Sequence, residues 1–148
     1  MIPHMPPRLV RSDRLFPGAP YAYAAVAPPG SIIFTAGACP IDETGTVAAP
    51  GDYAAQAGHT VANLVTALAA AGAGLEDVLK TTVYVASADQ ADLVAVWDVM
   101  HDAFGSHDAP STLLGVTTLG YTDQLVEIEA VALAGQQAPA ARAPALET

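Results

Sequence analysis

Residues 125–131, Leu-Val-Glu-Ile-Glu-Ala-Val, alternate between apolar and acidic side chains. This two-residue period is that of a β-strand, whose neighbouring side chains point to opposite faces of the sheet. Val126 and Ile128 are therefore expected on one face. Glu127 and Glu129 share the other. A sheet built around this strand has one face suited to a core and one face that carries carboxylates.

Residues 78–85, Val-Leu-Lys-Thr-Thr-Val-Tyr-Val, are rich in β-branched side chains and predict another strand. A helix is expected before it, over residues 53–71. Apolar side chains recur at helical spacing from Ala57 to Leu68. The Asp52 carboxylate can cap this helix by accepting a backbone N–H, and the glycines of the following Ala-Gly-Ala-Gly segment end it.

A second helix is expected behind that strand. Asp89 is its candidate N-cap, an apolar stripe follows from Leu93 to Phe104, and Gly105 ends it. A Pro-Gly turn at 27–30 separates the first two long strands. The remaining predicted strands cover residues 21–26, 31–36, 111–118 and 125–133, with a short first strand near 8–13.

The order of the main elements is ββαβαββ, which predicts an α+β fold with two helices on one face of a mixed sheet. The sequence predicts no third helix for the other face, so the simplest way to cover that face is contact with further copies of the chain. The predicted domain spans residues 8–135. It lies between a flexible arm at 1–7 and a disordered Ala/Pro-rich tail at 136–148.

The distribution of charge excludes several classes of ligand. The formal net charge is −10, and between residues 15 and 141 the only lysine or arginine is Lys80, against 13 carboxylates. Nucleic-acid binding needs several basic side chains to neutralise phosphates, so no nucleic-acid partner is expected. A Gly-rich phosphate loop with its lysine is absent as well. An anionic ligand would depend on backbone N–H groups, on Lys80 or on the terminal segments.

The same sequence shows no sign of a membrane, a metal or a disulfide. No apolar stretch reaches the ~18 residues of a membrane span, and no apolar h-region of a signal peptide is visible. Cys39 is the single cysteine, which excludes an internal disulfide. The four histidines do not form a zinc-type motif. The simplest compartment is the cytoplasm.

Three kinds of side chain are candidates for chemistry, each with a plain structural alternative. Cys39 is a buried thiol, a thiol that lines a site, or, less in keeping with the lack of positive neighbours, a nucleophile. Glu127 and Glu129 act as general acids or bases if they are buried at an interface, and otherwise form a solvated edge or pair with Lys80. Trp97 is a core residue or the wall of a site.

The whole body resembles the RidA family, also called YjgF/YER057c, over about residues 8–134. The resemblance implies a chorismate-mutase-like fold in a homotrimer, with a central β-barrel, helices outside and three intersubunit clefts. It also implies hydrolysis of reactive enamines and imines such as 2-aminoacrylate, without a metal or organic cofactor. The matching motifs are Ala19-Pro20-Tyr21, Ile32-Ile33-Phe34-Thr35-Ala36-Gly37 with Pro40, the helix at 52–74, Lys80-Thr81-Thr82-Val83-Tyr84-Val85 and Val126-Glu127-Ile128-Glu129-Ala130.

The resemblance assigns roles residue by residue. Glu127, the first glutamate of the Val-Glu-Ile-Glu motif, matches the residue that orients the attacking water. Tyr21 matches the tyrosine of the Pro-Tyr motif. Gly37 and Cys39 match backbone positions that line the cleft. Trp97 aligns with a helix asparagine that often lines it.

Thr112 departs from the family pattern. Typical deaminating members have Pro-x-Arg-Ser/Thr here, and the arginine grips the substrate carboxylate, whereas residues 110–113 read Pro-Ser-Thr-Leu. Threonine lacks the bidentate, charge-assisted contact of a guanidinium. Losing ~1.5–3 kcal/mol weakens binding of the acid roughly ten- to a hundredfold. A neutral or cationic ligand would suit the acidic cleft better, with Trp97 and Leu114 shaping an apolar wall.

Two functions follow as hypotheses. The first is an imine or enamine hydrolase with Glu127 as general base and Thr112 as a hydrogen-bonding hydroxyl. The second is a non-catalytic trimer that binds a metabolite or a partner protein. RNA cleavage, which has been attached to some family members, is disfavoured by the anionic body. The expected partners are therefore further copies of the chain and a small molecule.

Overall fold

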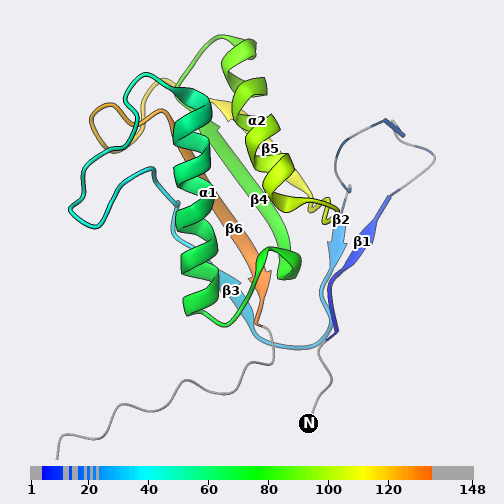
Figure 1. Cartoon of the computed structure of the whole chain (residues 1–148). Helices are drawn as coiled ribbons and strands as arrows, with labels where there is room; N and C mark the ends of the chain where they lie inside the picture. The colour runs from blue at the N-terminus through cyan, green and yellow to red at the C-terminus, as the bar shows by residue number, and fades with distance from the viewer. Residues whose placement is uncertain are drawn as a thin grey trace, which may run out of the picture.

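The computed structural model describes residues 5–11, 14, 17–18, 20, 22 and 24–134. Two helices and a mixed sheet make up most of the domain (Figure 1). The elements in chain order are β1 (Arg8–Val10), β2 (Ala24–Val26), β3 (Ile32–Phe34), α1 (Tyr53–Ala70), the 3₁₀ turn η1 (Leu75–Asp77), β4 (Val78–Val85), α2 (Gln90–Phe104), β5 (Ser111–Gly115) and β6 (Val126–Leu133).

The main sheet has four strands in the order β3-β6-β4-β5. Strand β6 pairs antiparallel with β3 and with β4, while β5 pairs parallel with β4. A parallel pair needs a crossover, and α2 provides it between β4 and β5. Strands β1 and β2 form a separate antiparallel pair. The sheet is therefore mixed, as the sequence predicted.

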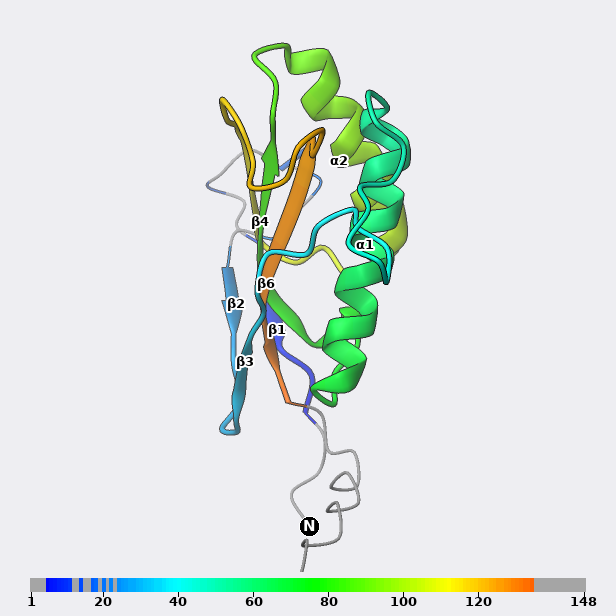
Figure 2. The ribbon, with the colours of Figure 1, turned by 90° about the vertical axis from the view of Figure 1, so that its left-hand side faces the viewer.

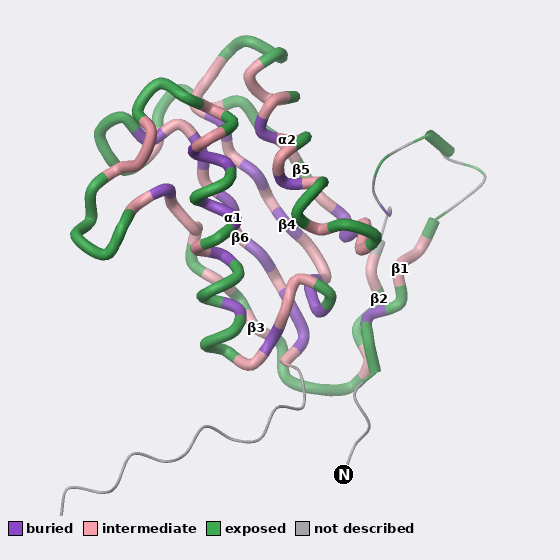
Figure 3. Tube along the Cα trace, in the orientation of Figure 1, coloured by how far each residue is buried: buried purple, intermediate pink, exposed green. Residues whose placement is uncertain are grey.

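Both helices lie on the same side of the sheet (Figure 2). Their inner faces and the facing side chains of β4 and β6 form the buried core. Figure 3 shows buried segments at intervals along these four elements. The fully buried members include Leu64, Leu68, Val83 and Ile128. No described helix covers the other side of the sheet, which is called the uncovered face below. The predicted α+β class with two helices on one face is confirmed.

The predicted helix caps are present. Asp52 Oδ1 accepts the backbone N–H of Ala55 at 2.9 Å, and Asp89 Oδ1 accepts that of Ala91 at 2.9 Å. Each bond satisfies one of the N–H groups that a helix N-terminus leaves without an internal partner. Gly105 follows α2 with a φ of 60°, a left-handed value that glycine adopts without the steric penalty of a side chain.

Three predicted strands differ in extent or pairing. The segments around β2 and β3 are strands, but they do not pair with each other across the Pro-Gly turn. Strand β2 pairs with β1 and β3 pairs with β6, because β3 completes the main sheet with a partner at the far end of the chain. Strand β5 ends at Gly115 rather than near 118, where the chain leaves the sheet edge for the loop before β6.

A buried glutamine in α1 is a feature that the sequence analysis missed. Gln56 is fully buried, and its amide donates to Asp123 O at 2.9 Å while its Oε1 accepts from Leu125 N at 2.7 Å. These bonds fix the end of the loop that precedes β6. The two hydrogen bonds of Gln56 position the residues directly before β6, the strand that carries Glu127.

Parts of the predicted organisation lie outside the described residues. These are the tail at 136–148, residues 1–4 of the arm at 1–7, and Tyr21. The described part of the chain contains no helix that is long and apolar enough to span a lipid bilayer.

Candidate functional site

The uncovered face presents its side chains in rows across the strands. Thr82 of β4 lies opposite Glu129 of β6 and beside Thr112 of β5. In the next row, Tyr84 lies between Glu127 and Leu114 on the same two neighbouring strands. Directly opposed residues of paired strands point to the same face, so these rows place hydroxyls and carboxylates next to one another. The predicted sharing of one face by Glu127 and Glu129 is confirmed.

Glu127 packs against the chain segment that follows β3. Ala38 and Ile128 exchange two backbone hydrogen bonds, Ala38 N to Ile128 O at 2.7 Å and Ile128 N to Ala38 O at 3.1 Å. This bridge brings Gly37 and Cys39 beside Glu127. A Cβ at Gly37 would lie 2.5 Å from both Cδ and Oε1 of Glu127, so only glycine leaves room for the carboxylate.

The Cys39 thiol donates a hydrogen bond to Glu127 Oε1 at 3.2 Å. Burial, first, and then the hydrogen bond to Glu127 and the charge of its carboxylate together raise the pKa of Cys39 to about 11. The thiol therefore stays protonated near neutral pH and acts as a donor. Among the readings left open by the sequence, the structure favours a thiol that lines the site over a nucleophile.

A tyrosine holds the second glutamate. Tyr84 donates its hydroxyl to Glu129 Oε1 at 2.8 Å. This hydrogen bond raises the pKa of Tyr84, because ionising the phenol would remove the donor and place a second anion beside the carboxylate. The negative charge of Glu127 also contributes to the raised pKa of Tyr84. Tyr84 therefore interacts with both glutamates, as the cross-strand partner of Glu127 and as the hydrogen-bond donor to Glu129.

Lys80 lies next to Thr112, the position at which the sequence comparison with the family expected an arginine. Its Nζ donates to Thr112 Oγ1 at 2.6 Å. Desolvation lowers the pKa of Lys80. Within the described part of the chain, Lys80 forms no ion pair with a carboxylate. Pairing of Lys80 with Glu127 or Glu129, one of the alternatives raised by the sequence, is not observed.

Trp97 and Thr112 meet at the free edge of β5. They line an open cleft of about 450 Å³ together with Pro20, Val94, Ser111 and Leu113. Trp97 is half-buried and packs against the core as well, so it is both a core residue and a wall. Leu114 does not line this cleft. It lies on the uncovered face with 42% of its surface exposed.

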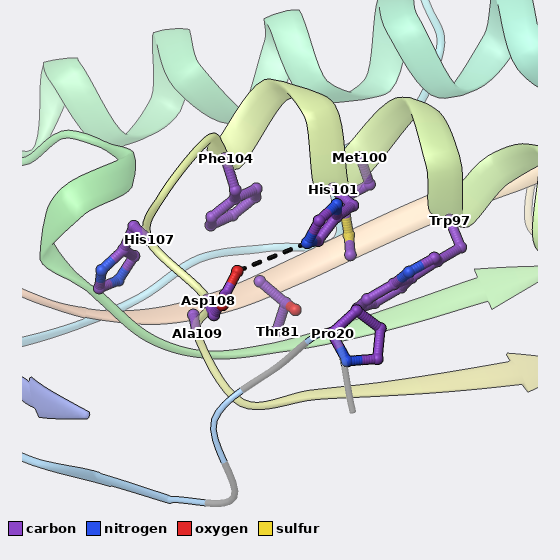
Figure 4. Close-up of a pocket in the computed structure, with 9 residues that line it drawn as sticks. All are labelled: Pro20, Thr81, Trp97, Met100, His101, Phe104, His107, Asp108 and Ala109. Atoms are coloured by element: carbon purple, nitrogen blue, oxygen red, sulfur yellow. Dashed lines mark ion pairs between the residues drawn. The ribbon is translucent and has the colours of Figure 1, made fainter. Parts of the chain in front are cut away.

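His101 of α2 and Asp108, from the segment before β5, form a polar contact next to Trp97 (Figure 4). The His101 ring stacks on Trp97 at a centroid distance of 5.8 Å, and its Nε2 lies 3.4 Å from Asp108 Oδ1. Asp108 also pairs with Arg11. The enclosed space here is only about 10 Å³, room for one water at most. These contacts tie the N-terminal segment to α2.

The described chain therefore divides the predicted site residues into two groups. Glu127, Gly37 and Cys39 lie together on the uncovered face. Thr112 belongs to the same face but lies at the β5 edge, where it lines a cleft with Trp97. Tyr21 falls outside the described residues. Lys80 and Tyr84 were not among the predicted site residues, although the alternation within 78–85 places both on the face that carries Glu127. No group of three or more metal-ligating side chains occurs among the described residues.

Comparison with known proteins identifies the family. Residues 12–134 match the model of the family described as Endoribonuclease L-PSP. The chain is 37% identical to a RutC family protein of Pyrococcus abyssi over 117 residues, 78% of this chain and 87% of the relative. The chain therefore belongs to this family, which includes the Rid and YjgF proteins, as its motifs predicted.

Two further matches bear on function and fold. The chain is 33% identical, over 78% of its length and 88% of the relative, to a protein of Acinetobacter baylyi named 3-aminoacrylate deaminase RutC. The crystal structure of a Rid family protein of unknown function, YyfB of Yersinia pestis, superimposes with a TM-score of 0.81 at 29% identity, over 87% of this chain and 99% of that one. The RidA fold inferred from the sequence is confirmed.

Proposed function

We propose that this protein binds a small imine- or enamine-like metabolite and hydrolyses it with Glu127 as the general base. The observation that carries the proposal is the placement of Glu127 on the uncovered face. The Cys39 thiol donates a hydrogen bond to Oε1 of Glu127, whereas Oε2 of Glu127 has no hydrogen-bond partner among the described residues. The Acinetobacter relative is named for deamination of 3-aminoacrylate, an enamine, which supports the same reaction class.

The chemistry needs one base and one water. Glu127 takes a proton from water while the water oxygen bonds to the carbon of the protonated imine, and the electron pair of the C=N double bond moves to nitrogen. The product is a neutral carbinolamine, and its amine nitrogen takes the proton back from Glu127. The C–N bond then breaks and ammonia leaves, while the hydroxyl oxygen forms the carbonyl and gives its proton to Glu127. An enamine enters this sequence after conversion to its imine tautomer.

A homotrimer would complete the site. Thr112 and Trp97 line a cleft to which, among the described residues, Glu127 and Cys39 do not contribute. The uncovered face carries Phe34 with 76% of its surface exposed, which is unfavourable for a lone subunit. Packing of three such faces around a central barrel buries these side chains and forms intersubunit clefts that the active site can occupy.

RNA is a poor candidate for the ligand, despite the family description. Between residues 24 and 134 the chain has Lys80 as its only lysine or arginine, against 13 carboxylates. A phosphate backbone would meet strong repulsion at such a surface. We therefore propose a small molecule as the ligand, in the cytoplasm.

The proposal is tested by ammonia release from imines generated in solution. Wild type is compared with Glu127→Gln, which removes the base and keeps the shape, and with Glu43→Gln as a control in the exposed loop before α1. Loss of a general base lowers the rate by about 10²–10⁴. We expect this loss in Glu127→Gln and no change in Glu43→Gln. Equal rates in wild type and Glu127→Gln would contradict the role of Glu127.

Binding without catalysis is the second candidate function, and Thr112 is the observation that favours it. A substrate carboxylate has no bidentate partner at this position. The variant Thr112→Arg separates the two candidates. A gain of 2-aminoacrylate hydrolysis in this variant supports a catalytic apparatus that is otherwise intact. If wild type is inert on every imine but is stabilised by a metabolite in a thermal-shift screen, the binding function is favoured.

A further inference from the structure

We propose that Asn63 of α1 is a positioning residue for the Glu127 carboxylate, and that it acts through the backbone of Cys39. Its side-chain Nδ2 donates to Cys39 O at 2.7 Å and to Ile41 O at 2.9 Å. Figure 2 shows the chain after β3 crossing from the sheet towards α1, the helix that carries this amide. The inference deepens the proposed function and rests on it for the role of Glu127 as a base.

The bonds of Asn63 belong to a segment, residues 39–41, in which every carbonyl accepts a hydrogen bond. The amide spans the carbonyls on both sides of Pro40. Pro40 O itself accepts from Ala48 N at 2.8 Å. A proline has no backbone N–H to donate, so the carbonyls are important anchors for this segment. Asn63 provides two of the three bonds and therefore sets where Cys39 lies relative to α1.

The Cys39 thiol depends on this support. A thiol is a weak hydrogen-bond donor, so its bond to Glu127 Oε1 at 3.2 Å does not by itself fix the backbone that carries it. The backbone bridge between Ala38 and Ile128 fixes the segment on the side of β6. Asn63 fixes it on the side of α1. The contact between thiol and carboxylate needs both anchors, and Asn63 is the one that a side-chain substitution removes.

The position of this asparagine in the sequence supports the same reading. Asn63 is the single asparagine of the chain and lies in the middle of α1. Asparagine is a poor residue for a helix interior, because its amide competes for the hydrogen bonds of the backbone. Here both N–H groups of the amide are used outside the helix. Contacts with residues 39–41 therefore account for its place in α1, whereas helix formation does not.

The test replaces Asn63 by leucine, which has a similar volume, favours the helix and has no N–H donor. The first readout is the pKa of Cys39, measured on the full chain from the Cβ carbon shift in NMR spectra of cysteine-labelled protein. Cys39 is the single cysteine, so one signal titrates. Its pKa is about 11 in wild type, and Glu127 contributes to this value. We expect the midpoint to fall by about one pH unit in Asn63→Leu, because the thiol loses its contact with the carboxylate.

The second readout is ammonia release. A general base acts only within hydrogen-bond reach of the proton that it takes, and a displacement of about 1 Å can cost about a hundredfold in rate. In Asn63→Leu, kcat should fall about tenfold to a hundredfold, while KM changes little. Thr66→Leu is the matched control, since Thr66 is exposed on the same helix and its hydroxyl bonds to Ala62 O within α1 at 3.0 Å. It should match wild type in both readouts.

An unchanged titration of Cys39 in Asn63→Leu would overturn the inference, because the thiol would then reach Glu127 without the amide. A lower kcat with an unchanged titration would overturn it as well, since Asn63 would then act on stability alone. Asn63→Ala repeats both measurements if the leucine variant does not fold. Glu127→Gln separates the two proposals. If this variant releases ammonia like wild type, the role of Glu127 as a base fails, while the titration still decides whether Asn63 positions the carboxylate.

Discussion

The Cys39 thiol and the Glu127 carboxylate lie 3.2 Å apart, Sγ to Oε1, although 88 positions separate them in the sequence. The backbone bridge between Ala38 and Ile128 brings the two together, since each of these residues precedes or follows one member of the pair. Because Ile128 is part of β6, the Glu127 carboxylate is positioned by a strand of the sheet rather than by a loop. In the proposed role of Glu127 as a base, a carboxylate that is fixed in this way needs little reorganisation before it reacts.

Replacing Gly37 by alanine should disable Glu127 without unfolding the chain. The new Cβ would fall 2.5 Å from Glu127 Cδ, so the carboxylate has to leave its place beside Cys39. Overpacking of this kind lowers the free energy of unfolding by about 1–3 kcal/mol. We expect ammonia release to fall nearly to the level of Glu127→Gln.

Gly30→Ala is the matched control, because a Cβ there meets nothing within 4 Å. It should keep both activity and stability. Circular dichroism checks that each variant is folded. If Gly37→Ala keeps full activity, the close packing of Glu127 is irrelevant to the reaction.

The Cys39 thiol should react slowly with alkylating reagents. Its pKa of about 11 lies two units above the ordinary 9.0, so the thiolate population at pH 8 falls by about a hundredfold. Cys39 is the single cysteine, so iodoacetamide labelling followed by mass spectrometry reports on it alone. The same chain in denaturant provides the fast reference rate. Glu127→Gln should label faster than wild type, because two of the causes that raise the pKa disappear.

The raised pKa of Cys39 also makes stability depend on pH. The unfolded thiol ionises near 9.0 and the folded thiol near 11. The favourable contribution of the neutral folded thiol is therefore complete below pH 9 and is lost as pH rises towards 11. Cys39→Ala should show a shallower fall in the unfolding midpoint across this window than wild type. Identical profiles for the two proteins would contradict the assignment.

The long strands and helices were predictable because their patterns are strong and local. The prediction for residues 78–85 matches β4 residue for residue, and Asp52 and Asp89 cap the predicted helices. The pairing of β3 was not predictable in this way. A turn at 27–30 suggests a local hairpin, whereas the partner that β3 uses, β6, lies at the other end of the chain.

The candidate site was only partly predictable for the same reason. The alternation within 125–131 identifies the face that carries Glu127, because it depends on one strand alone. The contact between Lys80 and Thr112 depends on the parallel register of β4 and β5, which the crossover through α2 sets. No periodicity in either strand encodes that register. The contact of Lys80 with Thr112 was therefore not predictable from the sequence.

The buried amide of Gln56 should contribute strongly to stability. It bonds to the loop before α1 through Ala49 and to the loop before β6 through Asp123 and Leu125. Gln56→Leu keeps the volume and removes these bonds, which leaves buried backbone groups without partners. Each such group costs about 1–3 kcal/mol, so we expect a loss of at least this size in urea unfolding. Gln90→Leu, at an exposed position of α2, should change the free energy little.

Phe34 offers the sharpest test of the proposed trimer. It is 76% exposed on the uncovered face and lies opposite Val131 of β6. An aspartate here would be buried against other copies, and an unpaired buried charge opposes association. Phe34→Asp should therefore sediment as a monomer, where wild type sediments as a trimer. Because the proposed clefts need neighbouring subunits, the same variant should lose ammonia release.

Val65→Asp is the matched control, since Val65 is an apolar residue of α1 with 41% of its surface exposed on the helix layer. It places the same charge on the opposite side of the molecule and should leave both the trimer and the activity intact. A monomeric wild type, or a Phe34→Asp variant that remains trimeric and active, would show that the uncovered face is not the surface of association. The intersubunit site would then have to be abandoned, because Glu127 projects from that face.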